Sequence, residues 1–188
     1  MKFQAYFIIV LLTVSCKEEK SEEHFILKSS TAISIVNDVV FFKKEKFSGT
    51  LLELDQNKKD TALSEKYKNG LLNGISKKWY PNKQLMESRA FKNGHKDGRQ
   101  IAYWANGNKR FEFVARNDAY EGEMKEWSIN GRLFHLAHFI NGQEEGTQKM
   151  WYENGKIRAN YAIIKGKRYG LLGTKNCKNV SDSIFVVK

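Results

Sequence analysis

Large apolar residues and turn-forming residues recur along the chain with a fixed period. Glycine stands at every twenty-fourth position over much of the sequence, at Gly74, Gly98, Gly122, Gly146 and Gly170. Five positions after the first four glycines come the large apolar residues Trp79, Tyr103, Trp127 and Trp151, and eight positions after them come Asn82, Asn106, Asn130 and Asn154. Each unit ends on a second turn: Asn93-Gly94, Asn117-Asp118, Asn141-Gly142 and Lys165-Gly166. A period of this length predicts a repeat architecture.

The turn residues predict two short antiparallel strands in each unit. Asn-Gly between β-prone residues is typical of a type I′ hairpin, whose two central residues both need positive φ. We expect such a turn twice per unit, with strands near 75–80 and 85–91 and equivalents downstream. Glycine and asparagine recur too often for an uninterrupted helix. The pattern therefore predicts an all-β fold, an elongated single-layer antiparallel β-meander built of 24-residue hairpin repeats.

Two weaker copies extend the array toward the N-terminus. One opens at Gly49, with Leu54 in the apolar position and Asn57 in the asparagine position, and it is one residue longer than the others. Farther upstream, residues 42–49 match residues 91–98 in register. We therefore expect the array to span residues 33–173, with residues 174–188 as a C-terminal cap.

The glycine, the Trp-Tyr-x-Asn-Gly run and the closing Lys-Asn-Gly resemble the MORN-repeat-variant family. Bacterial members of that family are often labelled YwqK-like toxin–antitoxin components, and similar proteins are treated as binding or scaffolding modules. The resemblance covers about three quarters of the chain and implies a MORN-like fold, with an antitoxin role as an analogy at the level of the family. The departures at Pro81, Lys83, Asp118 and Ser128 indicate divergent turns rather than another fold.

Strand alternation sorts the aromatic residues into two rows on opposite faces. The row five after each glycine is always large and apolar, so we expect it to be buried. The row six after each glycine accepts charge and hydroxyl, which predicts an exposed face, and it reads Asp55, Tyr80, Trp104, Ser128 and Tyr152. Tyr80, Trp104 and Tyr152 are the candidates for partner binding, with cross-strand stacking as the alternative role.

Catalytic and metal-binding motifs are not found in the sequence. His135 and His138 are three apart on a predicted strand and so face opposite ways, and no serine or cysteine has the flanking residues of an activated nucleophile. We predict a non-enzymatic protein with no catalytic residue, no metal site and no cofactor. Cys177 lies past the last repeat glycine, where it is either a small packed residue of the cap or a reactive thiol activated by Lys175 and Lys178.

The first sixteen residues predict export and lipidation. Lys2 precedes an apolar run at residues 5–12 that is too short to span a bilayer, which is typical of a signal peptide. Thr13-Val14-Ser15-Cys16 resembles a lipobox, so we expect residues 1–15 to be cleaved and Cys16 to carry the lipid. Residues 16–32 then form a charged tether. Its acidic start is similar to the surface-export signal of Bacteroidota lipoproteins, which favours the outer membrane on either its periplasmic or its surface-exposed side.

Charge and length add only broad limits. The 188 residues fit one domain, and the formal net charge is +11. The lysines are scattered through turns without a basic helix or an arginine cluster, which favours a solvated surface over nucleic-acid binding. The leading hypothesis is a membrane-anchored repeat scaffold that binds a protein partner in the bacterial envelope. The alternatives are an antitoxin or immunity protein that neutralises a toxin, and a module that binds peptidoglycan or lipid headgroups.

Overall fold

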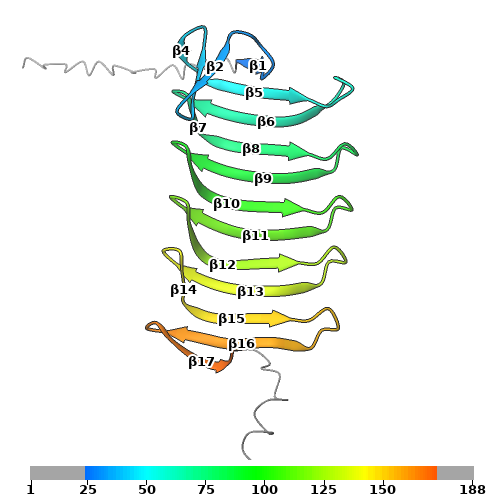
Figure 1. Cartoon of the computed structure of the whole chain (residues 1–188), viewed down its shortest axis with the longest axis vertical. Coiled ribbons are helices and arrows are strands. Elements are labelled where there is room, and N and C mark those ends of the chain that lie inside the picture. The colour runs from blue at the N-terminus through cyan, green and yellow to red at the C-terminus, as the bar shows by residue number, and fades with distance from the viewer. Residues whose placement is uncertain (1–23, 173–188) are drawn as a thin grey trace, which may run out of the picture.

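A computed structural model describes residues 24–172 of the chain, which form seventeen β-strands and no helix within that range (Figure 1). One long sheet holds fourteen strands, and its order follows the sequence from β5 to β17. The predicted all-β fold and the antiparallel meander of hairpins are confirmed. The strands of this sheet are β1 (Phe25–Leu27), β5 (Gly49–Leu54), β6 (Thr61–Lys68), β7 (Leu71–Leu72), β8 (Gly74–Trp79), β9 (Leu85–Lys92), β10 (His95–Tyr103), β11 (Lys109–Arg116), β12 (Ala119–Trp127), β13 (Leu133–Ile140), β14 (Gln143–Glu144), β15 (Gly146–Trp151), β16 (Ile157–Ile164) and β17 (Lys167–Leu171).

The second turn of each repeat has the predicted type I′ conformation. Asn93 and Gly94 have φ values of 50° and 87°, and both are positive as this turn requires. Asp118, which stands where most repeats have glycine, still takes a φ of 67°. Asparagine and aspartate tolerate this left-handed region better than other side chains do. The hairpin at Asn117-Asp118 therefore keeps the geometry of its neighbours.

The first turn of each repeat differs from the prediction, which gave it the same type I′ conformation. In the turn at Asn106-Gly107 only Gly107 has positive φ, at 88°. The Gly107 amide donates to the Trp104 carbonyl at 2.9 Å, and the Trp104 amide donates to the Asn108 carbonyl at 2.8 Å. This is a type I turn followed by one left-handed residue, the form that longer hairpin loops adopt with a bulge. The prediction of two type I′ turns per unit is wrong here because the loop is longer than two residues.

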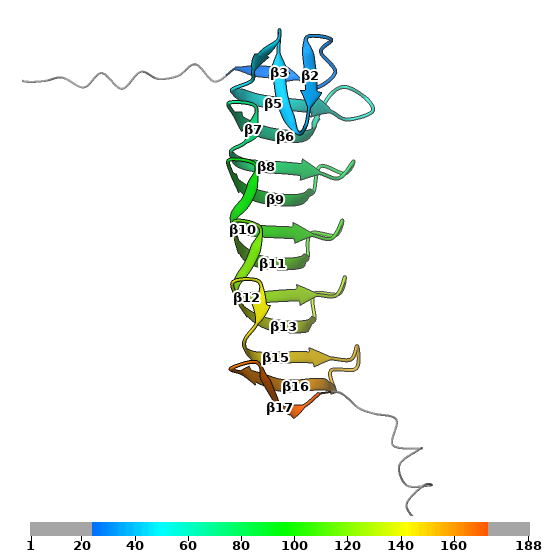
Figure 2. The same cartoon turned by 60° about the vertical axis from the view of Figure 1, so that its left-hand side comes forward.

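The repeat glycines mark the points at which the strands bend. Along β10, Lys96 pairs with Phe91, but the next pair joins Gln100 to Arg89, so β10 carries two extra residues around Gly98. Gly98 has a φ of 103°, and an added Cβ would meet the Ala90 side chain at 3.0 Å. Bulges of this kind increase local bending. Figure 2 shows the result, because the first parts of β10 and β12 turn out of the plane of the sheet along one edge.

A deeply buried row lies two positions after four of the repeat glycines, rather than five positions after each glycine as predicted. Gln100 and Gln148 are 0% and 2% exposed, and Leu51 and Met124 hold the same position in their repeats. The Gln100 side-chain amide donates to the Ala90 carbonyl at 2.8 Å, and that of Gln148 donates to the His138 carbonyl at 2.8 Å. These glutamines bond carbonyls of the preceding repeat beside each bulge. The predicted core row five after the glycine is only half-buried.

The N-terminal end of the array is closed by a small extra sheet and by β1. Strands β2 (Ile33–Val36), β3 (Val39–Phe42) and β4 (Glu45–Lys46) form a three-stranded sheet, in addition to the single layer that we expected. Val40, Phe47 and Leu51 form the buried cluster beneath it. Strand β1 pairs in parallel with β5, so part of the segment 16–32 that we predicted as a tether belongs to the sheet.

The hairpin joining β3 and β4 has the turn predicted from its match to residues 91–98. Lys43 and Lys44 have φ values of 50° and 72°, close to those of Asn93 and Gly94. The match therefore holds for local conformation, although these strands belong to the small sheet. At the opposite end of the array, β17 is an exposed edge strand. Within residues 24–172, no helical segment long and apolar enough to cross a bilayer is present.

Candidate binding surface

The aromatic residues six positions after the repeat glycines link one repeat to the next. The Tyr80 hydroxyl donates to the Tyr103 carbonyl at 3.0 Å, and the Trp104 indole Nε1 donates to the Trp127 carbonyl at 3.0 Å. Both donors are half-buried, contrary to the predicted exposure of this row, whereas Tyr152 of the same row is exposed as predicted. The Arg110 guanidinium lies 4.9 Å from the centre of the Trp104 ring, within range of a cation–π contact. We call this set of cross-repeat contacts the aromatic ladder.

The repeat asparagines form a second ladder beside it. The Asn82 side-chain amide donates to the Ala105 carbonyl at 3.0 Å, and that of Asn106 donates to the Ile129 carbonyl at 2.8 Å. The Asn106 side-chain oxygen also accepts from the Asn108 amide at 3.1 Å. Each of these asparagines therefore caps its own turn and bonds the following repeat. The sequence pattern identified them as turn residues, but it did not show this second contact.

The aromatic ladder is interrupted at Asp55 and Ser128, whose side chains are too short to cross to the next repeat. Each interruption leaves an open pocket of about 460 Å³. Both pockets lie on the side of the sheet that carries the first turn of each repeat, which we call the first-turn edge. The Ser128 pocket lies between Ser128 and the next repeat's Trp151 and Tyr152. The Asp55 pocket lies between Asp55 and the next repeat's Trp79 and Tyr80. Both pockets thus occupy the positions that Tyr80 and Trp104 fill elsewhere in the array.

The Ser128 pocket has both apolar and polar groups in its lining, and several of the polar groups are already bonded. Ile129 is 53% exposed and Tyr152 is 42% exposed, and Leu133 and Trp151 also line the pocket. The Ser128 hydroxyl accepts from the Arg132 amide at 3.3 Å. The Arg132 guanidinium donates to the Glu153 carbonyl at 2.9 Å, which links the two repeats at the rim. The remaining surface suits a flat apolar group.

The Asp55 pocket has the same position in its repeat but carries an acidic rim. The Asp55 carboxylate accepts from the Lys59 amide at 2.9 Å, and this contact holds the turn. Lys83 forms an ion pair with Asp60 at 2.8 Å, and that hydrogen bond raises the pKa of Lys83. Glu53, Asp55, Asp60 and Lys83 line the pocket, and Lys28 lies 3.8 Å from the Glu53 carboxylate. This pocket therefore combines an apolar interior with an excess of negative charge.

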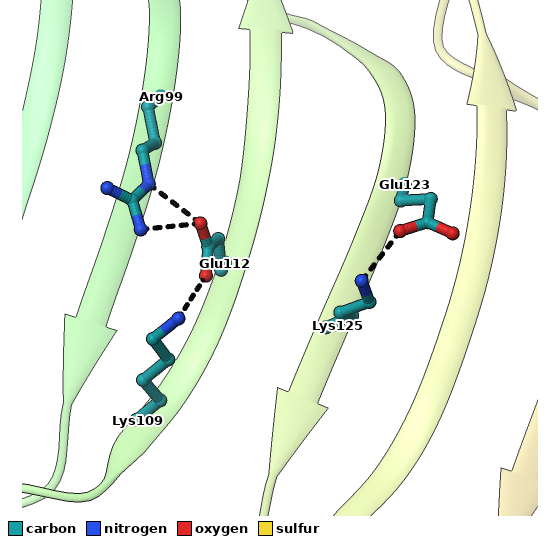
Figure 3. Close-up of polar contacts among 5 residues, drawn as sticks. All are labelled: Arg99, Lys109, Glu112, Glu123 and Lys125. Atoms are coloured by element: carbon teal, nitrogen blue, oxygen red, sulfur yellow. Dashed lines mark hydrogen bonds and ion pairs between the residues drawn. The ribbon is translucent and has the colours of Figure 1, made fainter.

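Ion pairs join residues of neighbouring strands or of the same strand in the central repeats (Figure 3). Arg99 and Lys109 both bond Glu112, at 2.6 Å and 2.7 Å, and Lys125 bonds Glu123 at 2.6 Å. Burial raises the pKa of Glu112, but the hydrogen bonds and charges of Lys109 and Arg99 together outweigh burial and lower that pKa below its ordinary value. Part of the basic charge is therefore used to join strands within the sheet.

A second aromatic row crosses the central strands, apart from the ladder. Neighbouring ring centres lie 5.7 Å apart for Phe111 and Phe113, 4.5 Å for Phe113 and Tyr120, and 5.0 Å for Tyr120 and Phe139. These distances are typical of packed aromatic pairs. Arg89 lies 5.2 Å from the centre of the Phe111 ring and covers one end of the row. The row joins β11, β12 and β13, so it stabilises the array along its length.

The structure separates the residues that the sequence singled out for partner binding. Tyr152 lines the Ser128 pocket, Tyr80 lines the Asp55 pocket, and Trp104 lines neither because it fills its own position in the ladder. Cys16 and Cys177 lie outside the described residues. Asp55 and Ser128, which we interpreted only as signs of exposure, mark the two pockets. The signal that would have found them is the loss of an aromatic residue from an otherwise aromatic row.

The histidines of β13 have separate partners in the sheet. His135 Nδ1 lies 2.8 Å from a carboxylate oxygen of Glu126, and His138 Nδ1 lies 3.0 Å from the Glu145 carbonyl. No group of three histidine, cysteine, aspartate or glutamate residues suited to a metal ion is found among residues 24–172. The two open pockets are therefore the main candidate sites on the described part of the chain.

Comparison with known proteins supports the repeat unit at two places in the array. No curated protein matches the chain. A family model described as MORN repeat variant matches residues 72–93, which cover β8 and β9, and residues 144–161, which cover β15 and part of β16. The chain is thus a β-sheet repeat array whose hairpins are similar, over these two stretches, to the MORN repeat variant.

Proposed function

We propose that this chain is a scaffold of the bacterial envelope, held on the outer membrane by a lipid on Cys16, and that it binds a protein partner along its first-turn edge. The observation that carries the proposal is the interrupted aromatic ladder. A rigid array presents two open pockets on one edge, each with the size and lining of a site for a protein side chain. Repeat arrays commonly use such extended surfaces for binding.

The arrangement of charge also favours a protein partner over a flat anionic surface. Arg99, Lys109 and Lys125 are paired with carboxylates of the same sheet. The Asp55 pocket, at the same edge as the Ser128 pocket, carries more acidic than basic groups. These carboxylates disfavour direct contact of that pocket with an anionic bilayer or glycan, whereas a protein segment can match both pockets. Roles as an antitoxin or in binding peptidoglycan or lipid headgroups remain predictions from the sequence.

Photo-crosslinking in cells that export the full chain tests this proposal. A benzophenone amino acid at position 129, on the rim of the Ser128 pocket, should give an adduct with one discrete protein. The matched control is position 35, because Ile35 is 56% exposed, close to the 53% of Ile129, but lies in the small sheet. The same adducts at both positions, or no protein adduct at position 129 in an exported and folded chain, would contradict the proposal.

A further inference from the structure

We infer that the two pockets are receptor positions for aromatic side chains of the partner, which complete the ladder where the chain's own residues do not. This inference rests on the proposed function and specifies the chemistry of its site. The ligand that it assigns is a tryptophan or tyrosine side chain, a flat ring with one hydrogen-bond donor. The argument comes from the occupied positions of the same ladder, which show what the pockets accept.

The occupied positions supply the template for the ligand. At Tyr80 a phenol and at Trp104 an indole lie across the boundary between repeats, and each donates to the carbonyl of the residue that is five after the next glycine. In the interrupted repeats the equivalent carbonyls belong to Trp79 and Trp151, which line the two pockets. A ring from another chain can therefore make the contact that an internal ring makes in the central repeats.

The volume and charge of the pockets agree with this ligand. Each pocket of about 460 Å³ has room for an indole together with the backbone that carries it. The Asp55 pocket has three carboxylates against the ammonium groups of Lys83 and, at Glu53, Lys28, whereas the Ser128 pocket has Arg132 against Glu153. Charge complementarity thus favours an aromatic residue beside a lysine or arginine at the first pocket, and an uncharged neighbourhood at the second.

The spacing of the pockets limits the partner further. The Asp55 and Ser128 pockets are three repeats apart, and each repeat contributes two strands of the sheet. With strands about 4.8 Å apart, the pockets are separated by roughly 29 Å. A partner that fills both must present two aromatic residues at about that distance, which also gains affinity from binding at two points.

The test is protein-observed NMR of the full chain in detergent, titrated with N-acetyltryptophanamide. We expect saturable shifts at the amides of Trp151 and Tyr152 and at those of Trp79 and Tyr80. The Ser128→Trp variant should lose the first set and keep the second, because its own indole fills that pocket. Ile35→Trp adds an indole away from both pockets and should keep both sets. N-acetyl-1-methyltryptophanamide lacks the donor and should bind severalfold more weakly.

A second variant keeps the inference testable even if Ser128→Trp fails to fold. Trp104→Ala removes one of the chain's own rings from the aromatic ladder and so opens a third position for the probe. N-acetyltryptophanamide should then raise the melting temperature of this variant more than that of the parent chain. Shifts confined to other residues, shifts unchanged in folded Ser128→Trp, or binding of an N-acetylglucosamine trisaccharide at the pockets instead would overturn the inference. A crosslinked protein at position 129 without any binding of the probe would overturn it while leaving the proposed function intact.

Discussion

Backbone ladders between neighbouring strands join the repeats, and single side chains that reach a carbonyl one repeat away add further bonds. Tyr80, Asn82, Trp104 and Asn106 each span about one repeat in this way. A buried or half-buried carbonyl that loses such a donor costs about 1–3 kcal/mol. The contribution of a ladder residue to stability therefore depends on its contact with the following repeat as well as on the burial of its ring.

Trp104→Ala and Trp127→Ala should cost similar amounts of stability, each about 2–4 kcal/mol. The sequence pattern predicted Trp104 on an exposed face and Trp127 in a buried row, but the structure shows both rings half-buried and shows Trp104 bonded to the Trp127 carbonyl. Chemical denaturation of the full chain measures both losses. A loss below about 1 kcal/mol for Trp104 beside a much larger loss for Trp127 would instead support the prediction from the sequence, with Trp104 exposed and Trp127 buried.

Ser128→Trp should stabilise the array by about 1 kcal/mol, because it adds a ring and one hydrogen-bond donor where the aromatic ladder is interrupted. The added indole has the position that Trp104 has one repeat earlier, and its acceptor would be the Trp151 carbonyl. Ile35→Trp adds the same side chain to the small sheet and should change the free energy of unfolding by much less. A destabilised Ser128→Trp variant would show that the pocket does not have the geometry of a missing rung.

At the scale of the strands, the turns and bulges show which features the sequence can and cannot predict. The positive φ values at Asn93-Gly94 follow from local chemistry, so the period and the hairpins were predictable. The buried positions of Gln100 and Gln148 were not, since a polar residue is buried there only because a bulge leaves carbonyls of the neighbouring strand to be bonded. The pockets were missed for a related reason. Each pocket lies between a short side chain of one repeat and the aromatic residues of the next, so no single residue identifies it.

The ion pairs between strands should make stability depend on pH in the acidic range. The pKa of Glu112 is lowered in the folded chain, so its contribution is fully present above the carboxylate's ordinary pKa and is lost as the pH falls through the lowered value. Glu112→Gln should therefore cost about 0.5–1 kcal/mol at pH 7 and much less near pH 3.

Glu123→Gln is the matched control, because the Glu123 side chain is 59% exposed and exposed pairs contribute little. Denaturation of both variants and the parent chain at pH 7 and pH 3 gives the comparison. An equal loss for Glu112→Gln at the two pH values would show that the carboxylate does not act through its charge.

At the scale of the whole molecule, the proposed lipid anchor would decide where the array works. We expect Cys16→Ala to abolish the proposed lipidation, since the thiol of this cysteine is the predicted acceptor of the lipid. The variant should remain unprocessed or soluble, whereas the parent chain should move into the detergent phase. Detergent-phase partitioning and globomycin-sensitive processing measure the difference. Equal partitioning of variant and parent would contradict lipidation at Cys16.

The central claim is that the Asp55 and Ser128 pockets, where the aromatic ladder is interrupted, bind a protein partner. The most direct measurement is quantitative mass spectrometry of proteins captured from envelope extract by the full chain, by the filled variant Asp55→Tyr/Ser128→Trp, and by Ile35→Trp as the control. We predict that the filled variant keeps its fold but captures the partner crosslinked at position 129 at least tenfold less than the parent chain, while the control captures it normally. Equal capture by the folded, filled variant would contradict the account.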